Sequence, residues 1–272
     1  MDKLTDRIAL LRNRSRAFPN ALFLHDIVAD EVKERLEDVN RKFQNTAIVT
    51  GFPDFWQAQF PDAHIVADDD VLNLTENSFE LILHVMTLHW ANDPVGQLVQ
   101  CRRALKPDGL LLCACLGGQT LHELRSVLAE AEAVVAGGLS PRIAPMGEIR
   151  DLGGLLQRAG LALPVADGVP LTVSYLNAFH IMHDLRRMGE NNALAHRARH
   201  FTMRNILTEA ATLYSEHFTN EEGRVNATYE IIILTGWAPA DTQPQALRPG
   251  SATNRLADVL GTTETLLKNG KV

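Results

Sequence analysis

The sequence is poor in cysteine, and its three cysteines are an odd number that cannot all pair with one another. Cys113 and Cys115 lie in an apolar run, and one residue separates them instead of the two-residue spacer of a redox or zinc pair. We therefore expect both of them, and Cys101, to be reduced thiols in the protein core, which favours a reducing cytosol.

Long hydrophobic runs and an excess of basic charge are also absent. No apolar stretch reaches the ~18–20 residues that span a bilayer, and the N-terminus has no hydrophobic segment of a signal peptide. With 26 basic and 33 acidic residues, the formal net charge is −7, which argues against general nucleic-acid binding. A length of 272 residues, 46% of them hydrophobic, is enough for one sizeable core.

Strand-like and helix-like segments alternate along most of the chain. Apolar runs predict strands at residues 47–50, 64–67, 79–86, 110–116, 163–173 and 228–235. Helical spacing and capping residues predict helices at 6–17, 26–39, 94–105, 120–136, 148–159, 177–188 and 205–217. Residues 106–109 and 167–168 are expected to be turns. This alternation predicts an α/β fold, with a mostly parallel sheet and helices on both faces.

Composition divides the chain into three parts. Residues 1–40 are expected to form N-terminal helices, 41–238 an α/β domain with a helical insertion at about 177–218, and 239–272 a polar, loosely attached tail. The first part begins with a basic arm that carries five basic residues against Asp2 and Asp6. This arm is either a solvated helix face or a segment that touches a partner or folds over a cleft.

Glycine is scarce where a nucleotide-binding sheet needs it. Ligands bind such sheets beyond the carboxyl ends of the strands, and a nucleoside needs a glycine-rich turn after the first strand. Here Gly51 is the only glycine, and Phe52, Phe55 and Trp56 follow it. We expect these rings to pack against the sheet and fill the corner.

The connection to the second strand is also short. Only twelve residues separate Gly51 from His64, and a crossover needs at least ~10–12 residues. There is room for one short crossover, so one strand–helix unit is expected to be missing or shortened.

Polar residues follow the next two predicted strands. An acidic run at 68–70 is either a solvated turn or an acceptor for an adenine amino group, and mutual repulsion argues against three carboxylates in one cleft. His84 and His89 lie at and just past the end of the following strand, beside Trp90. Each histidine is a candidate general base or a packed core residue. Their spacing matches no known metal motif, and we predict no metal site.

Several segments carry a resemblance to a known family. The strand Phe79-Glu-Leu-Ile-Leu, the segment Leu88-His-Trp-Ala-Asn-Asp93 and Leu105-Lys-Pro-Asp-Gly109 resemble class I S-adenosylmethionine-dependent methyltransferases of the type 11 group. Leu-His-Trp with Asn-Asp is shared by biotin-pathway malonyl-carrier-protein methyltransferases and by the methyltransferase-like assembly factor of respiratory complex I.

Later segments are similar to the assembly-factor family. They are Gly117-Gly-Gln-Thr-Leu-His-Glu-Leu-Arg125, Gly138-Leu-Ser-Pro-Arg-Ile-Ala-Pro145, Asp151-Leu-Gly-Gly-Leu-Leu-Gln-Arg-Ala-Gly160, Asp184-Leu-Arg-Arg-Met-Gly-Glu-Asn-Asn192, Ala227-Thr-Tyr-Glu-Ile231 and Pro249-Gly-Ser-Ala252. The likeness covers nearly the whole chain and suggests an alphaproteobacterial or mitochondrial relative. It implies a location in the bacterial cytoplasm, with peripheral membrane contact through the basic arm, or in the mitochondrial matrix of a eukaryote.

The resemblance implies a Rossmann-like, seven-stranded class I methyltransferase fold with a C-terminal antiparallel strand. It also implies S-adenosylmethionine as cofactor and a complex I subunit as protein client, and the mitochondrial member is associated with hydroxylating an arginine of that subunit. The cofactor side would use Gly51, Asp68, Asp69 and Leu88. The catalytic side would use His89, Trp90 and His84.

Two departures from the family pattern change this expectation. The acidic glycine-rich loop keeps one glycine, and the second strand with its ribose-binding acid has no counterpart, whereas Ala67-Asp68-Asp69 matches the adenine-side motif. We therefore expect weak or absent S-adenosylmethionine binding, in a degenerate methyltransferase-fold protein that matures or assembles a protein client. The alternatives are an active methyltransferase with an altered loop, and an arginine hydroxylase with a metal on His84, His89 and an acid from 68–70.

Overall fold

The computed structural model describes residues 3–244 and 256–263. Contacts divide the chain into two units, Met1–Ala240 and Asp241–Val272. In the second unit, the described residues include the short helix α9 (Leu256–Leu260), whereas the segment 249–252 lies outside the described residues. The loose attachment of residues 239–272 stays a prediction.

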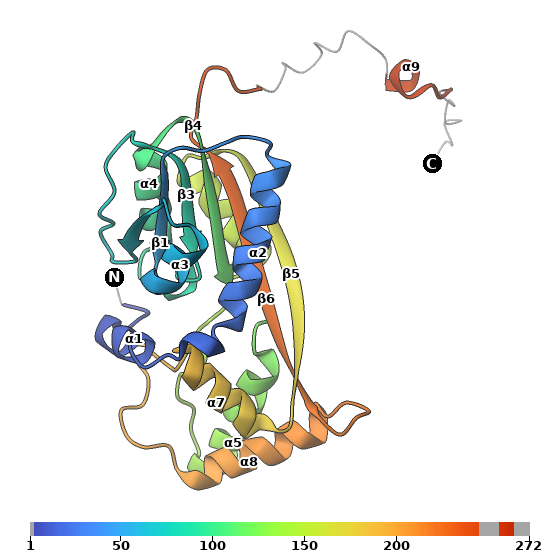
Figure 1. Ribbon diagram of the computed structural model, residues 1–272. Coiled ribbons are helices and arrows are strands. Elements are labelled where there is room, and N and C mark those ends of the chain that lie inside the picture. The colour runs from blue at the N-terminus through green and yellow to red at the C-terminus, as the bar shows by residue number, and fades with distance from the viewer. Residues whose placement is uncertain (1–2, 245–255, 264–272) are drawn as a thin grey trace, which may run out of the picture. The chain divides into compact units, whose positions relative to one another are not determined.

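A six-stranded sheet organises the first unit. Its strands are β1 (Thr46–Thr50), β2 (His64–Ala67), β3 (Phe79–Val85), β4 (Leu105–Leu116), β5 (Ala162–Tyr175) and β6 (Val225–Trp237). Their order is β2-β1-β3-β4-β6-β5 (Figure 1). The first four strands are parallel, and β6 runs antiparallel to both β4 and β5. This confirms the predicted Rossmann-like sheet with its C-terminal antiparallel strand.

Helices connect and cover these strands. They are α1 (Arg7–Arg14), α2 (Phe23–Asp38), α3 (Pro53–Gln59), α4 (Pro94–Ala104), α5 (His122–Ala136), α6 (Ile149–Arg158), α7 (Ala178–Met188) and α8 (Arg204–His217), with short 3-10 helices η1 (Pro19–Ala21) and η2 (Leu88–Trp90). Side chains of Asp6, Asp93 and Asn177 accept backbone N–H groups at the starts of α1, α4 and α7. Helices α7 and α8 form the predicted insertion between β5 and β6.

The short connection between β1 and β2 contains only α3, a helix of 7 residues. The described sheet therefore has one strand fewer than the seven that the resemblance implies. This confirms the missing strand–helix unit, because twelve connecting residues cannot hold a second crossover.

Each face of the sheet has its own hydrophobic core. Ile48 packs with the buried residues of α2, α5, α7 and α8, whereas its neighbours Ala47 and Val49 pack with those of α4 and α6. Successive side chains of a strand point to opposite faces, so a strand covered on both sides is apolar throughout. The three cysteines are free and buried, as predicted.

Two predicted turns are wrong. Strand β4 already begins at Leu105, and residues 106–109 form an irregularity inside it, with Asp108 at a φ of 61° and a register shift against β3. Strand β5 continues through residues 167–168, which pair with Ile233 and Ile232 of β6. At 167–168, pairing with β6 overrides the local preference of Asp-Gly for a turn. Residues 106–109 have no partner in the register with β3, which passes from Leu105 to Leu110.

Among the described residues, no helix is long and apolar enough to cross a membrane.

Candidate functional site

The candidate site lies at the carboxyl ends of the parallel strands. Strand order reverses at β1, which has β2 on one side and β3 on the other, and ligands of open α/β sheets bind at such a point. Gly51 follows β1, Asp68 follows β2, and η2 with His89 and Trp90 follows β3. These four predicted residues are therefore brought to one edge of the sheet.

The aromatic corner after β1 is packed as predicted. The Trp56 side chain is fully buried, and Phe52 is nearly so. The Trp56 Nε1 donates a hydrogen bond of 3.1 Å to Nδ1 of His25 on α2, and the His25 and Phe52 rings lie 4.6 Å apart. Burial lowers the pKa of His25 to about 3, so its ring is a neutral acceptor. These rings fill the corner that a glycine-rich turn would leave open.

Asp68 is held by two arginines of the N-terminal arm, which we define as residues 4–17. Arg7 donates to both carboxylate oxygens at 2.7 and 3.0 Å, and Arg14 Nη1 donates to Oδ2 at 2.8 Å. The side chains of Asp68 and Arg14 are each only 3% exposed. Burial alone would raise the pKa of Asp68, but the hydrogen bonds and charges of Arg7 and Arg14 outweigh burial and lower it to about 2.

The other predicted cofactor residues have different surroundings. Asp69 is largely exposed and binds Arg7 at 3.0 Å. In the acidic run, Asp68 is therefore buried in the cleft, whereas Asp69 faces solvent. Leu88 is buried in the core on the α4 side of the sheet. Of the predicted acceptors, only Asp68 is a buried carboxylate at the strand ends.

Arg14 also covers Gly51. A Cβ built on Gly51 would overlap the guanidinium of Arg14, which lies 5.8 Å from the centre of the Phe52 ring. The Arg14 atoms Nε and Nη2 are buried and have no hydrogen-bond partner in the described part of the chain. A groove of about 570 Å³ runs between the arm and this turn, with Leu11 and Phe55 among its walls.

The described arrangement does not fit S-adenosylmethionine. The carboxylate that would accept the adenine amino group is paired with Arg7 and Arg14, and the one glycine that would allow close approach lies against Arg14. A nucleoside at this place would have to displace both contacts.

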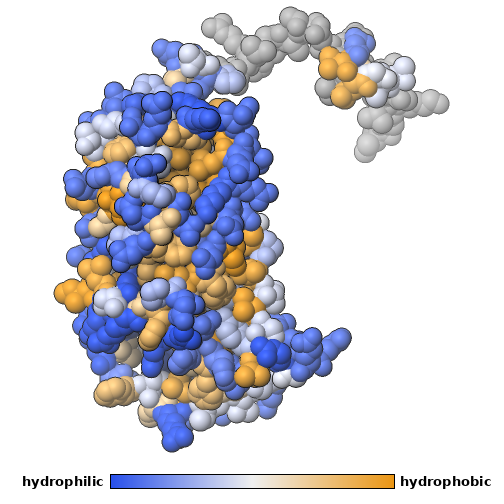
Figure 2. All heavy atoms as spheres, viewed as in Figure 1, coloured by the Kyte–Doolittle hydropathy of each residue, from blue (hydrophilic) through white to orange (hydrophobic). Residues whose placement is uncertain are grey.

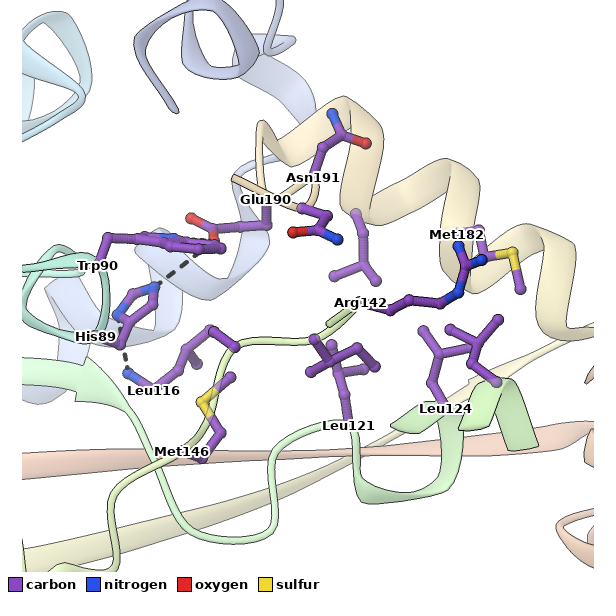
Figure 3. A pocket seen from close by; sticks show the side chains of 15 residues that line it. His89, Trp90, Leu116, Leu121, Leu124, Arg142, Met146, Met182, Glu190 and Asn191 are labelled. Atoms are coloured by element: carbon purple, nitrogen blue, oxygen red, sulfur yellow. Dashed lines mark hydrogen bonds and ion pairs between the residues drawn. The ribbon is translucent and has the colours of Figure 1, made fainter. Parts of the chain in front are cut away.

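A second cavity, of about 160 Å³, lies beyond the ends of β3 and β4. This is far more than the roughly 15 Å³ that one water molecule needs. Figure 3 shows His89, Trp90 and Glu190 grouped at one end, with Arg142 and Met182 at the other. We call this cavity the Glu190 pocket. Its other walls are mostly apolar and include Leu116, Leu121, Leu124, Leu128, Ile143, Ala144, Met146 and Leu185.

Glu190 is the acidic group of this pocket, whereas Arg142 at the other end is paired with Glu132 at 2.6 Å. Trp90 Nε1 donates to Glu190 Oε2 at 2.7 Å, and His89 Nε2 lies 3.6 Å from the same oxygen. Oε1 is buried without a hydrogen-bond partner among the described residues. Burial alone would raise the pKa of Glu190, but His89, Arg14 and Trp90 outweigh burial and lower it. Glu190 is therefore an ionised carboxylate with one oxygen that accepts no hydrogen bond from the described residues.

The two candidate histidines have different roles in the structure. His89 lines the Glu190 pocket and accepts a 3.4 Å hydrogen bond from the Leu116 N–H at Nδ1. His84 is fully buried, with Nε2 2.9 Å from Gln97 Oε1 and Nδ1 3.3 Å from Thr87 Oγ1. His84 is not among the residues that line the pocket. A catalytic role therefore stays a prediction, with geometric support for His89 and Trp90 alone.

The described residues contain no group of three or more His, Cys, Asp or Glu side chains that could hold a metal ion. The metal set proposed for a hydroxylase, His84, His89 and an acid from 68–70, is not assembled. His84 is bonded to Gln97, and Asp68 is bonded to arginines.

Three important side chains are not among the predicted site residues. Arg7 and Arg14 belong to the basic arm, for which folding over a cleft is one of the two alternatives left open by the sequence. In the structure the arm does lie over the cleft, where both arginines bind Asp68. Glu190 lies in the segment 184–192, which carried part of the family resemblance but no suggested chemistry. A lone glutamate between a glycine and two asparagines gives no local sign of burial.

Comparisons with known proteins agree with the resemblance. A family model described as a methyltransferase domain matches residues 28–113. The mitochondrial arginine-hydroxylase NDUFAF5 of Rattus norvegicus is 35% identical over 260 residues, which cover 94% of this chain and 75% of that protein. The malonyl-(acyl-carrier protein) O-methyltransferase of Halorhodospira halophila is 31% identical over 182 residues, or 67% of this chain and 60% of that protein.

Solved structures of methyltransferases are more distant. A Bacillus halodurans protein described as a methyltransferase is 16% identical with a TM-score of 0.49, and the match covers 76% of this chain and 98% of that protein. The fold is therefore assigned from the strand order of the sheet and not from these solved structures. The identity over most of both chains shows that this chain belongs to the family of the mitochondrial arginine-hydroxylase NDUFAF5.

Proposed function

We propose that this chain binds an arginine side chain of a protein client and acts in the maturation of that client, a subunit of respiratory complex I. Arginine is proposed because the relative is named an arginine-hydroxylase, and the client is the one that the family resemblance implies. The observation that supports this proposal most directly is the free Oε1 of the buried Glu190 carboxylate.

A guanidinium suits the Glu190 pocket better than a neutral or anionic group does. An ionised carboxylate in an apolar cavity needs a cationic partner, and arginine presents several N–H donors in a plane. Trp90 holds Oε2 in place and offers its ring beside it, and tryptophan faces attract cations. The apolar walls suit the methylene groups of an arginine side chain. Any chemistry on the bound side chain would take place beside His89.

Calorimetric titration with N-acetyl-arginine methylamide tests the pocket, with the citrulline analogue as a neutral probe of the same shape. We expect the arginine compound to bind at least tenfold more tightly than the citrulline compound, and Glu190→Gln to remove that preference. Glu123→Gln is the matched control, because Glu123 is a buried carboxylate that is not among the residues lining the pocket. Equal binding of both compounds to the unaltered protein would exclude the proposal.

Weak S-adenosylmethionine binding is part of the same proposal. Asp68 and Gly51 are engaged by the arm, and the family's ribose-binding acid has no counterpart. Two lost charge-assisted hydrogen bonds, at roughly 1.5–3 kcal/mol each, weaken binding by a few powers of ten.

An active methyltransferase is the second candidate function. Gly51 and Asp68 remain at the ends of adjacent strands, and a malonyl-(acyl-carrier protein) O-methyltransferase is among the relatives. This candidate requires cofactor-dependent methyl transfer that Asp68→Ala reduces. Methyl transfer that is insensitive to Asp68→Ala would mean that the cofactor lies elsewhere.

We extend the proposal to peripheral contact with an anionic membrane, in the bacterial cytoplasm or the mitochondrial matrix. Helix α1 exposes Ile8 and Leu11 beside Arg12, and Phe18 follows it. Figure 2 shows hydrophobic surface next to hydrophilic surface at the left of this face, where Figure 1 places α1. Apolar and basic side chains on one exposed surface are typical of interfacial helices.

A further inference from the structure

The N-terminal arm is fastened over the strand ends at its beginning. The Asp6 N–H donates to the Ala193 carbonyl at 2.8 Å, and the Ala195 N–H donates to the Leu4 carbonyl at 2.8 Å. Arg197 adds an ion pair to Asp6 at 3.0 Å. These contacts hold the segment that carries Arg7 and Arg14 in place.

The two arginines offer Asp68 the same kind of group that a nucleoside would offer. An adenine amino group donates N–H bonds to a carboxylate, and Arg7 and Arg14 together donate three such bonds. Their charges make these bonds stronger than those of a neutral amino group. Because Arg14 also lies against Gly51, the arm fills both places that a nucleoside ligand would use.

We propose that the arm is an internal lid, and that a nucleoside ligand binds only after Arg7 and Arg14 have left Asp68. This inference rests on the part of the proposed function that treats the Gly51–Asp68 cleft as a remnant nucleoside site. It makes weak cofactor binding a property of the arm as well as of the shortened turn.

The closed lid leaves donors unsatisfied, and this favours reversibility. Only Nη1 of Arg14 has a partner, whereas Nε and Nη2 are buried without one in the described residues. Buried unsatisfied donors are costly, and an open arm would return them to water. Arg7 is about a quarter exposed, so it can leave Asp68 first.

The lid is connected to the Glu190 pocket. The residues that anchor the arm, Ala193 and Ala195, follow Glu190 within one segment. A Cβ on Gly189 would lie 3.1 Å from Cα of Arg14, so the backbone beside Glu190 packs directly on the arm. Opening the lid therefore has to move or release the segment that positions Glu190, which links the two sites.

Titration with S-adenosylhomocysteine tests the lid in three variants of the full chain. Arg7→Ala/Arg14→Ala removes both guanidiniums, and Arg7→Ala alone leaves Arg14 on Asp68 and so keeps that carboxylate paired. Arg12→Ala is the control, because Arg12 is exposed on the same helix. We expect the double variant to bind about tenfold more tightly than the unaltered protein, the single variant to show a smaller gain, and the control no change. Folded variants that all bind no better than the unaltered protein would overturn the proposal.

Hydrogen exchange on the unaltered protein is a second test of the lid. Saturating S-adenosylhomocysteine should speed amide exchange in residues 7–14, because the ligand selects the open arm. A saturated protein whose arm keeps its protection would also overturn the lid. The titration with the arginine compound tests the Glu190 pocket separately. A negative result for the lid therefore does not affect the proposal of arginine binding, and a negative result for arginine binding does not affect the lid.

Discussion

Asp68 shows how far a single residue can be understood from sequence. Its place after an apolar strand predicts a carboxylate at the edge of the sheet, and the structure puts it there. Its partners Arg7 and Arg14 come from more than 50 residues earlier, and no local pattern encodes so distant a pairing. The buried position of Glu190, 100 residues after Trp90, was unpredictable for the same reason.

The charge of Asp68 should make stability depend on acidity. Its pKa is about 2 in the folded protein against an ordinary 3.8. The pairing therefore stabilises the fold fully above about pH 4, and about 2 kcal/mol is lost as the pH falls from there to about 2. Urea unfolding of Asp68→Asn should show a lower free energy of unfolding at pH 7 and a deficit that shrinks toward pH 2.

Asp54→Asn is the control for this measurement, because Asp54 is an exposed acid in the first turn of α3. It should change the free energy of unfolding by no more than about 0.5 kcal/mol. An Asp68→Asn deficit that stays the same from pH 7 to pH 2 would mean that the arginines do not lower the pKa of Asp68.

At the scale of helices and strands, periodicity and capping residues were reliable guides. Helix α4 begins after Asp93 and helix α7 after Asn177, as their capping side chains predict. The length of the connection after Gly51 correctly predicts that one strand–helix unit is missing. The predicted turn at 167–168 was wrong because pairing with β6 decides the backbone there, and the one at 106–109 is an irregularity inside β4. How the arm docks could not be predicted, since its anchors lie near residue 194.

Gly189 tests the contact between α7 and the arm. It has a φ of 83°, in the left-handed region, and a Cβ would crowd the backbone of Arg14. Gly189→Ala should therefore lower the free energy of unfolding by about 1–2 kcal/mol and speed hydrogen exchange in α1. Gly154→Ala is the opposite case, because Gly154 lies inside α6 with open space around its Cα.

Gly154→Ala should raise the free energy of unfolding by about 0.5–1 kcal/mol, because alanine has the higher helix propensity. It should leave exchange in α1 unchanged. If Gly189→Ala is as stable as the unaltered protein and leaves α1 equally protected, the packing of α7 on the arm is not what holds the arm.

For the whole molecule, the distribution of charge over the surface says more about binding partners than the net charge does. The chain carries a net charge of −7, yet the arm and α7 share a basic groove lined by Arg16, His183, Arg186 and Arg187. Composition alone excludes general nucleic-acid binding, but it does not reveal this local positive surface. Only folding brings two arginines of α7 beside the arm.

This distribution predicts binding to anionic vesicles despite the negative net charge. Co-sedimentation with phosphatidylglycerol vesicles should fall roughly tenfold or more in Arg12→Ala/Arg16→Ala, and should weaken as salt rises. Arg150→Ala/Arg158→Ala removes the same charge from exposed positions on α6 and should bind as the unaltered protein does. Equal losses in both variants would assign the effect to net charge instead of the arm.

We propose that the arm and the aromatic corner leave S-adenosylmethionine no free site in the resting protein. The decisive measurement is a calorimetric titration of the full chain with S-adenosylmethionine at pH 7. We expect a dissociation constant at least a hundredfold above the low micromolar range, because two charge-assisted hydrogen bonds are lost. A low-micromolar dissociation constant for the unaltered protein would refute this proposal.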